Sequence, residues 1–306
     1  MSEIIRDGSL AGQIPAIPAF RPASPYVFAE RAERLAELAA GHPLEGYLRF
    51  AASLSAAQQK LLASLPELAV PDETALAHCL EHGLPPLSVD GHRRDPLWRD
   101  ALARLIDLLD RAALPAVGAA VIEGVLALSP EILEAAAAHL LAGAYADVDP
   151  AEAPFIAAAL QAYWVKMGLQ LSAAAMGTPA QIGVCPVCGS HPVASVVRIG
   201  GAQQGLRYLV CSLCCSEWHM VRVKCSACAS TKGISYLAVE GAGDAIKAEC
   251  CGQCKTYLKI FYLEKNTGLV PTSDDLASLT LDMLVDEAGY HRLGPNLLFA
   301  PGRSAP

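Results

Sequence analysis

Apolar residues between positions 26 and 176 recur at spacings of three and four, as in Leu35, Leu38 and Ala39. This period is typical of amphipathic α-helices that bury one face. Seven prolines in this region are predicted to end helices, and several of them can instead occupy the first turn of the next helix, as at Pro130, which follows the candidate N-cap Ser129. The pattern therefore predicts roughly six to eight helices without a helical repeat. The interrupting prolines are at positions 43, 71, 85, 86, 115, 130 and 154.

The pattern changes after residues 177–179. Short stretches rich in Val, Ile and Tyr follow at 206–210, 218–223, 234–239 and 257–263, and their alternation predicts β-strands. Residues 274–288 again carry a broad apolar face and predict one helix. Residues 294–306 are expected to form a loose tail. The prolines within residues 1–25 predict an extended arm that lies on the surface of its own domain.

The composition supports packed helices. Of the 306 residues, 53% are hydrophobic but only 6% are aromatic, because alanine and leucine supply most of the apolar positions. The net charge of −8 argues against nucleic-acid binding over the whole surface. The most apolar windows, 112–128 and 157–176, contain Glu123 and Lys166, so we expect buried helices and no membrane span. Residues 1–9 lack the apolar segment of a secretory signal, which predicts a cytoplasmic protein.

Eight of the eleven cysteines form four C-x-x-C pairs, and the spacing C-x2-C-x22-C-x2-C occurs twice. Paired cysteines in a chain without an export signal indicate metal ligands in a reducing compartment. Two such pairs can place four thiolates around one ion in a tetrahedron, as in structural zinc sites. The sequence therefore predicts two metal sites. Their ligands are Cys185, Cys188, Cys211, Cys214, Cys225, Cys228, Cys251 and Cys254.

The eight ligands could be grouped in sequence order, as the first four and the last four, or interleaved in two cross-braced sites. We favour sequential grouping because the ten residues between Cys214 and Cys225 suit a hinge between two stacked ribbons. Cys215 and Cys250 lie beside ligands and are interpreted as ordinary, partly buried thiols, with oxidation-sensitive thiols as the alternative. Cys79 is expected to be a small core residue of the helical domain.

Other residues near these sites are weaker candidates. His78 and His82 are four apart on a predicted helix, but no third ligand is evident, so a solvated helix face is the simpler interpretation. His191 and His219 lie near the cysteine pairs and are expected to form hydrogen bonds around the sites or surface contacts. Only the first pair is followed by glycine, Gly189, which readily adopts the positive φ that aims N–H groups at sulfur.

The chemistry of such sites is limited. Four thiolates leave no open coordination position on the ion. We therefore expect a structural role if the metal is zinc, one-electron chemistry if it is iron, and no hydrolysis at the metal. No catalytic motif stands out elsewhere, which predicts that the chain is not an enzyme. Residues 181–265 hold nine basic and five acidic side chains, but two such centres contribute about −4 and cancel this excess. A nucleic-acid-binding zinc ribbon and a C-x-x-C redox protein are the alternative functions.

Two strings around the cysteines resemble the formate dehydrogenase accessory protein family, FdhE. They are RYLVCSLC with EWHMVRVKC, within residues 207–225, and CGQCKTYLKI at residues 251–260. The resemblance extends from Cys185 to about Tyr290, and the family usually has other residues at positions 215 and 250. It implies a cytoplasmic protein that is required to assemble or activate respiratory formate dehydrogenase and that binds its catalytic subunit. It also implies rubredoxin-like ribbons, with iron as the favoured metal and zinc as the alternative.

These expectations define an α+β protein with an N-terminal all-helical domain, two tandem rubredoxin-like or zinc-ribbon modules and a C-terminal helix. The predicted parts are a Pro-rich arm over 1–25, the helical domain over 26–178, the first ribbon over 179–222, the second ribbon over 223–270, and the C-terminal helix and tail over 271–306. Residues that flank the ligands are candidates for contact with the client. They are Trp218, His219, Lys255, Thr256 and Tyr257, of which Trp218 and Tyr257 could instead cap the ribbon core.

Overall fold

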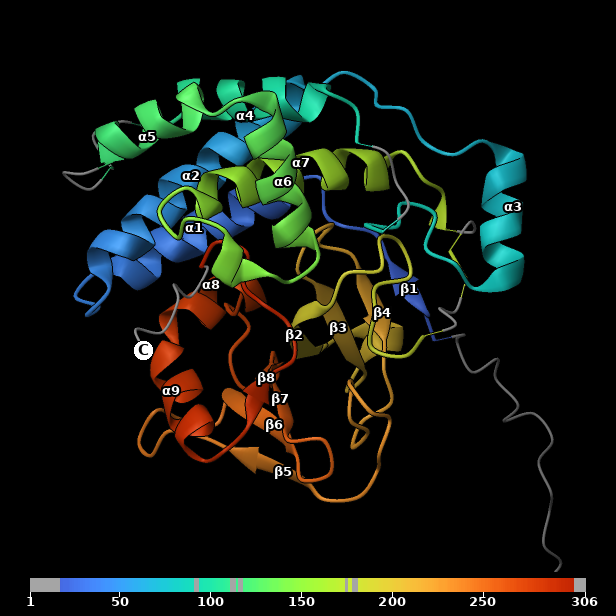
Figure 1. Cartoon of the computed structure of the whole chain (residues 1–306). Coiled ribbons are helices and arrows are strands. Elements are labelled where there is room, and N and C mark those ends of the chain that lie inside the picture. The colour runs from blue at the N-terminus through green and yellow to red at the C-terminus, as the bar shows by residue number, and fades with distance from the viewer. Residues whose placement is uncertain are drawn as a thin grey trace, which may run out of the picture.

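The computed structural model describes residues 17–90, 94–110, 114, 118–173, 176–177 and 181–299. Helices form one layer, and a mixed β-sheet with two further helices forms the other (Figure 1). The predicted α+β class, with the helices first and the cysteine-rich sheet after them, is confirmed. The exact division at residues 25, 178, 222 and 270 stays a prediction.

The helical layer is organised around one buried helix, α7. Nearly all residues of α7 are buried, and it packs against α2, α4 and α6. Helix α3 has no buried residue and lies to one side of the layer (Figure 1). Ser129 caps α6 as predicted, since its Oγ accepts a hydrogen bond from the N–H of Ile132 at 3.4 Å. The helices in the described part of this layer are α1 (Val27–Ala39), α2 (Glu45–Ser64), α3 (Glu73–His82), α4 (Leu97–Asp107), α5 (Gly118–Ala127), α6 (Pro130–Leu141) and α7 (Ala153–Leu169).

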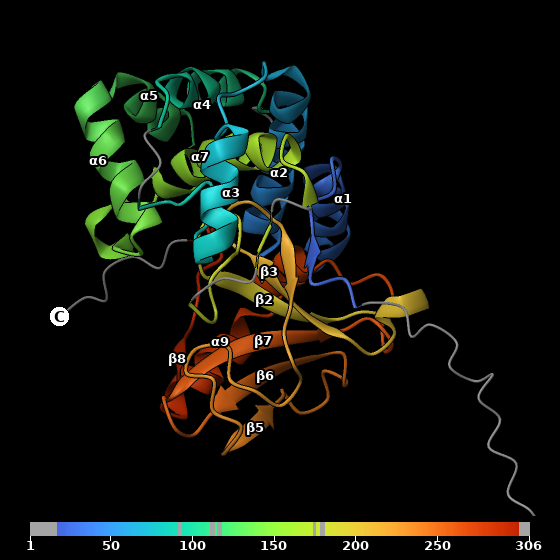
Figure 2. The ribbon, with the colours of Figure 1, turned by 90° about the vertical axis from the view of Figure 1, so that its right-hand side faces the viewer.

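The strands form one continuous sheet in the order β1-β4-β3-β2-β7-β6-β5, with β8 beside β7. Figure 2 shows the strands stacked below the helices. Apart from the short parallel pair of β7 and β8, the pairing within each half is antiparallel. Strands β2 and β7 run parallel and join the halves, with Ser195 opposite Ile260. The two predicted ribbons therefore share a sheet. The strands are β1 (Phe20–Arg21), β2 (Pro192–Val197), β3 (Arg207–Cys211), β4 (Glu217–His219), β5 (Ile234–Leu237), β6 (Ile246–Cys251), β7 (Thr256–Tyr262) and β8 (His291–Arg292).

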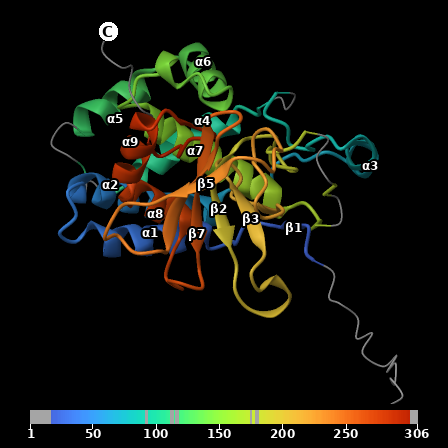
Figure 3. The same ribbon diagram turned by 90° about the horizontal axis from the view of Figure 1, so that it is seen from below.

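The C-terminal helix differs from the prediction. Residues 274–288 were expected to form one helix, but the chain forms α8 (Pro271–Ala277) and α9 (Leu279–Glu287) with a break at Ser278. The Ser278 hydroxyl donates to the carbonyl of Asp274 at 2.7 Å and accepts from the buried Lys259 ammonium at 3.1 Å. These side-chain bonds stabilise the break. Both helices lie beside the sheet, as the view from below shows (Figure 3).

Three other expectations need correction. The described part of the arm does contact its own helical domain, where Ala23 is buried, but Phe20 and Arg21 also pair with β4 and extend the sheet. The strand predicted at 218–223 is shorter and ends at His219. The first residues of the predicted tail are not loose: Leu297 and Leu298 are buried, and Asn296 donates to Asp275 Oδ2 at 2.9 Å. Residues 300–306 lie outside the described part.

None of the helices in the described ranges combines the length and the apolar character that a membrane crossing requires.

Candidate metal centres

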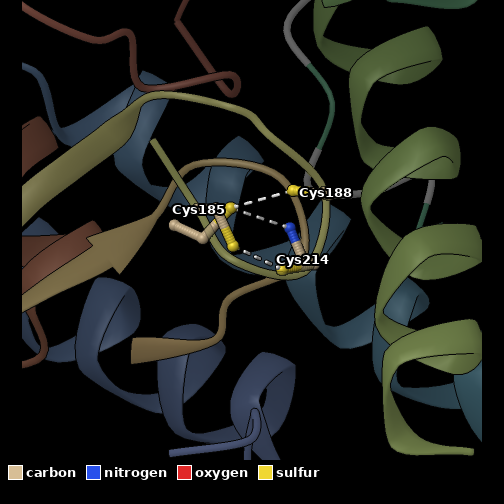
Figure 4. Close-up of side chains that lie close together, drawn as sticks. Cys185, Cys188 and Cys214 are labelled. Atoms are coloured by element: carbon tan, nitrogen blue, oxygen red, sulfur yellow. Dashed lines mark hydrogen bonds between the residues drawn. The ribbon is translucent and has the colours of Figure 1, made fainter. Parts of the chain in front are cut away.

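The eight predicted ligands lie in two groups, and the grouping is sequential. Centre 1 comprises Cys185, Cys188, Cys211 and Cys214, and centre 2 comprises Cys225, Cys228, Cys251 and Cys254. Within each group all four sulfur atoms lie within 4.8 Å of one another. Figure 4 shows the sulfurs of three centre 1 cysteines pointing toward one another. The fold therefore brings together residues that lie 29 positions apart in the chain.

The sulfur distances fit a tetrahedral ion. In centre 1, Cys185 Sγ lies 3.5 Å from Cys214 Sγ, and in centre 2, Cys225 Sγ lies 3.6 Å from Cys254 Sγ. A tetrahedron with metal–sulfur bonds of about 2.3 Å has sulfur–sulfur edges of about 3.8 Å. A disulfide would need about 2.05 Å, and all these cysteines are free thiols. Both groups can bind a metal ion.

Each C-x-x-C pair forms the same turn. In three of the pairs the N–H after the second cysteine donates to the carbonyl of the first, from Gly189 to Cys185 at 2.8 Å, from Ala229 to Cys225 at 3.1 Å and from Lys255 to Cys251 at 2.9 Å. Further N–H groups within the turn point at sulfur, such as that of Val187, 3.4 Å from Cys185 Sγ. This local geometry presents the thiolates before an ion binds.

The sequence suggested that only the first turn had the positive φ that glycine favours. The structure places all four equivalent residues in the left-handed region, although three of them carry a side chain. Their φ angles are 77° at Gly189, 58° at Cys215, 62° at Ala229 and 60° at Lys255. For residues other than glycine this conformation costs about 1–2 kcal/mol. The position after the second cysteine therefore predicts a positive φ, whichever residue occupies it.

The two centres differ in exposure. All four cysteines of centre 1 are no more than 1% exposed and belong to the same hydrophobic core as the helices. The N–H of Leu87 donates to the carbonyl of Val187 at 2.8 Å, and the Gln161 amide donates to the carbonyl of Ser212 at 2.7 Å. The helical layer therefore encloses centre 1, and no solvent-facing ligand remains there.

Centre 2 lies at the surface of the sheet. Cys228 is exposed and Cys254 is half-buried. The Thr256 hydroxyl lies 2.9 Å from Cys254 Sγ. Burial alone would raise the pKa of Cys254, but the hydrogen bonds from Thr256 and from the Cys228 and Cys225 thiols together lower that pKa to about 7. Centre 2 is consequently the more accessible of the two to chelators, exchange partners or electron donors.

Burial disfavours four thiolates in centre 1 unless a cation binds there. Desolvation raises the pKa of Cys185 and of Cys211 well above the ordinary value of a thiol. Four neighbouring thiolates cannot form there without a positive ion, since like charges in a low-dielectric interior repel. The donor set of four soft sulfurs fits zinc or iron and leaves no open coordination position. Such a centre can support structure or electron transfer but not metal-bound water.

The flanking residues proposed as client contacts divide into two kinds. Trp218 is 5% exposed and Tyr257 is 4% exposed, so both belong to the interior, and the Tyr257 hydroxyl donates to Asp282 at 2.7 Å. Both side chains pack in hydrophobic clusters, which agrees with the alternative interpretation that they cap the ribbon core. His219 is half-buried with its ring 5.7 Å from that of Tyr208. Lys255 is exposed and lies over the Tyr290 ring, 5.4 Å from its centre.

The remaining candidates are not part of a metal site in the described residues. His78 and His82 lie on the exposed helix α3 with ring centres 4.5 Å apart and no third ligand beside them. Cys79 on the same helix is half-buried, so the prediction of a core position is wrong. Cys215 and Cys250 are fully buried, not partly, and burial raises the pKa of each to about 11.

The fold and the two cysteine groups define a class of metal-binding protein in which two C-x-x-C ribbons share a sheet beneath a helical domain. The chain matches the segments described as "FdhE, N-terminal" over residues 16–180, "FdhE, central domain" over 184–222 and "FdhE, C-terminal domain" over 223–299. It belongs to the FdhE family.

Individual relatives agree along nearly the whole chain. The "Protein FdhE homolog" of Edwardsiella ictaluri is 45% identical over 298 residues, covering 97% of this chain and 95% of the relative. That of Pseudomonas aeruginosa is 42% identical, covering 98% of each. The crystal structure of the FdhE protein from Pseudomonas aeruginosa matches with a TM-score of 0.82 at 41% identity, over 93% of this chain and 100% of that one. These matches show that the predicted family is correct.

Proposed function

We propose that this protein is an accessory factor that assembles or activates respiratory formate dehydrogenase in the cytoplasm by binding its catalytic subunit. Membership of the FdhE family over nearly the full length carries this proposal. The chemistry of the site agrees, because two closed four-cysteine centres offer no position at which a substrate could bind metal. We infer a binding and assembly role, not an enzymatic one.

Both centres are proposed to hold one metal ion each, with iron favoured by the family resemblance and zinc as the alternative. The cysteines would hold the ion, and the buried first centre would tie the ribbons to the helical layer. Iron would add a reversible one-electron change, for which the exposed centre 2 is the accessible site. Elemental analysis of anaerobically purified protein distinguishes the metals: about two equivalents of iron support the proposal, and two of zinc restrict the centres to a structural role.

The client surface is proposed to lie around centre 2. Lys255 follows the ligand Cys254 directly and is exposed, whereas Trp218 and Tyr257 are buried and unavailable. Lys255→Glu with His219→Ala is expected to weaken capture of the formate dehydrogenase catalytic subunit by the metal-loaded protein. Lys60→Glu is the matched control, because Lys60 is an exposed lysine on α2 in the helical layer. Undiminished capture by the double variant would mean that the interface lies on another surface. Absence of capture by the unsubstituted protein would refute the accessory function.

A further inference from the structure

Arg31 on α1 is a buried cation for which the described residues provide no acidic partner. It is 1% exposed, and among the described residues no carboxylate lies within ion-pair distance of it. Its guanidinium donates to Gln161 Oε1 at 2.9 Å and to Gln58 Oε1 at 3.5 Å. It also lies 3.3 Å from Cys215 Sγ and 5.0 Å from the centre of the Phe28 ring. Its Nε has no hydrogen-bond partner within the described ranges.

Elsewhere in the described part of the chain, deeply buried cations are paired. The Arg207 guanidinium lies 2.7 Å from Glu249, and the Lys259 ammonium lies 2.9 Å from Asp275. A buried charge without a counter-charge is strongly unfavourable, because the interior replaces water with a medium of low polarity. Neutral amides and a thiol do not balance the charge of Arg31. The compensating negative charge must come from a group next to it.

Centre 1 is that group by position. Cys215, which the guanidinium contacts, follows the ligand Cys214 directly in the chain. Gln161, which accepts from Arg31, donates in turn to the carbonyl of Ser212 inside the same turn. A divalent ion with four thiolates carries a net charge of about −2. We propose that Arg31 is the counter-charge of the metal-loaded centre 1 and sets how tightly this centre holds its ion.

The role has two consequences. The positive charge stabilises the thiolate-bound ion, so metal binding at centre 1 is stronger with Arg31 than without it. Conversely, the loaded centre stabilises Arg31 on α1, so loading ties the helical layer to the sheet. Centre 2 provides an internal comparison, because its cysteines lie in the other half of the sheet, away from α1. The inference rests on metal binding at centre 1 and does not depend on the client.

The test uses the full chain loaded with Co2+, whose visible absorption reports tetrahedral thiolate coordination. Chelator competition is compared for the unsubstituted protein, Arg31→Met, Arg31→Lys and Arg34→Met. Arg34 lies on the same helix and pairs with Asp274, so its replacement removes a cation without touching centre 1. Arg31→Met is expected to lower the affinity for one of the two metal ions by about 10–100-fold, which is the loss typically seen when a residue that supports the ligands of a metal site is replaced. Arg31→Lys should restore most of the affinity.

A second measurement separates the charge from its hydrogen bonds to Gln58 and Gln161. If Arg31 acts through centre 1, Arg31→Met lowers the melting temperature of the loaded protein more than that of the metal-free protein. Equal losses in both forms would assign Arg31 a merely structural role and overturn the inference. Equal Co2+ affinity in Arg31→Met and the unsubstituted protein would overturn it as well. Absence of Co2+ binding by the unsubstituted protein would refute the metal site itself.

Discussion

Gly183 links the chain before centre 1 to the turn that carries centre 2. A Cβ atom at this position would lie 1.9 Å from the backbone carbonyl oxygen of Ser226, between the ligands Cys225 and Cys228. The φ angle of Gly183 is +77°, which L side chains rarely adopt. We predict that Gly183→Ala damages centre 2, although it lies only two residues before a ligand of centre 1.

Two contributions determine how much stability Gly183→Ala is expected to lose. The left-handed conformation costs about 1–2 kcal/mol for alanine. The contact with Ser226 involves backbone, so the turn itself must move, and overpacking of this kind typically costs about 1–3 kcal/mol more. Gly205→Ala is the matched control, because Gly205 has φ +73° and a methyl group added there would meet no described atom within 4 Å. Only the first contribution applies to it.

The assay combines urea unfolding of the loaded protein with the rate of metal loss to a chelator. Gly183→Ala should reduce the free energy of unfolding by about 2–5 kcal/mol, against about 1–2 kcal/mol for Gly205→Ala. It should also release one metal equivalent faster than the control does. Equal stability of the two variants, or unchanged metal release, would refute the packing of Gly183 against the centre 2 turn.

Three further predictions test the centres and their support. Cys188→Ser combined with Cys211→Ser should leave one metal equivalent by elemental analysis, since both lie in centre 1; loss of both equivalents would mean interleaved sites. Ala229→Gly should raise the stability of the loaded protein by about 0.5–1 kcal/mol in urea unfolding, because relief of left-handed strain exceeds the entropic cost of glycine; destabilisation would contradict the strained turn. Burial opposes ionisation of Asp275, but Arg292 and Lys259 lower its pKa below the ordinary 3.8. The ionised Asp275 carboxylate therefore stabilises the fold above about pH 4, and this stabilisation is lost as the pH falls through the pKa of the folded state. Asp275→Asn should lower the free energy of unfolding by about 3–5 kcal/mol at neutral pH, measured by thermal or urea unfolding, and should make stability depend less on acid pH. Unchanged stability of this variant would contradict the prediction.

The cysteine spacing predicted that the eight cysteines gather in two groups of four in sequence order, because each turn is a local structure with a characteristic spacing. The helical period likewise predicted the first layer. Local patterns did not indicate that β2 and β7 would pair, since nothing near Ser195 specifies a partner at Ile260. This pairing depends on contacts between residues distant in the chain.

Other features escaped prediction because they depend on a single side chain in its folded environment. The break at Ser278 arises from bonds to Asp274 and Lys259, whereas the apolar pattern alone favoured a continuous helix. Arg31 was not singled out by the sequence analysis, yet the fold buries it beside centre 1. Its importance is visible only once the sheet and the helices are placed against each other.

The most direct test of the proposed function is capture of the formate dehydrogenase catalytic subunit by anaerobically purified protein of known metal content. We predict two metal equivalents per chain, and capture that is lost when a chelator removes the ions and restored when they are returned. Capture that persists in fully metal-free protein would contradict a metal-dependent surface. A chain that holds two ions and never retains the subunit would contradict the accessory role itself.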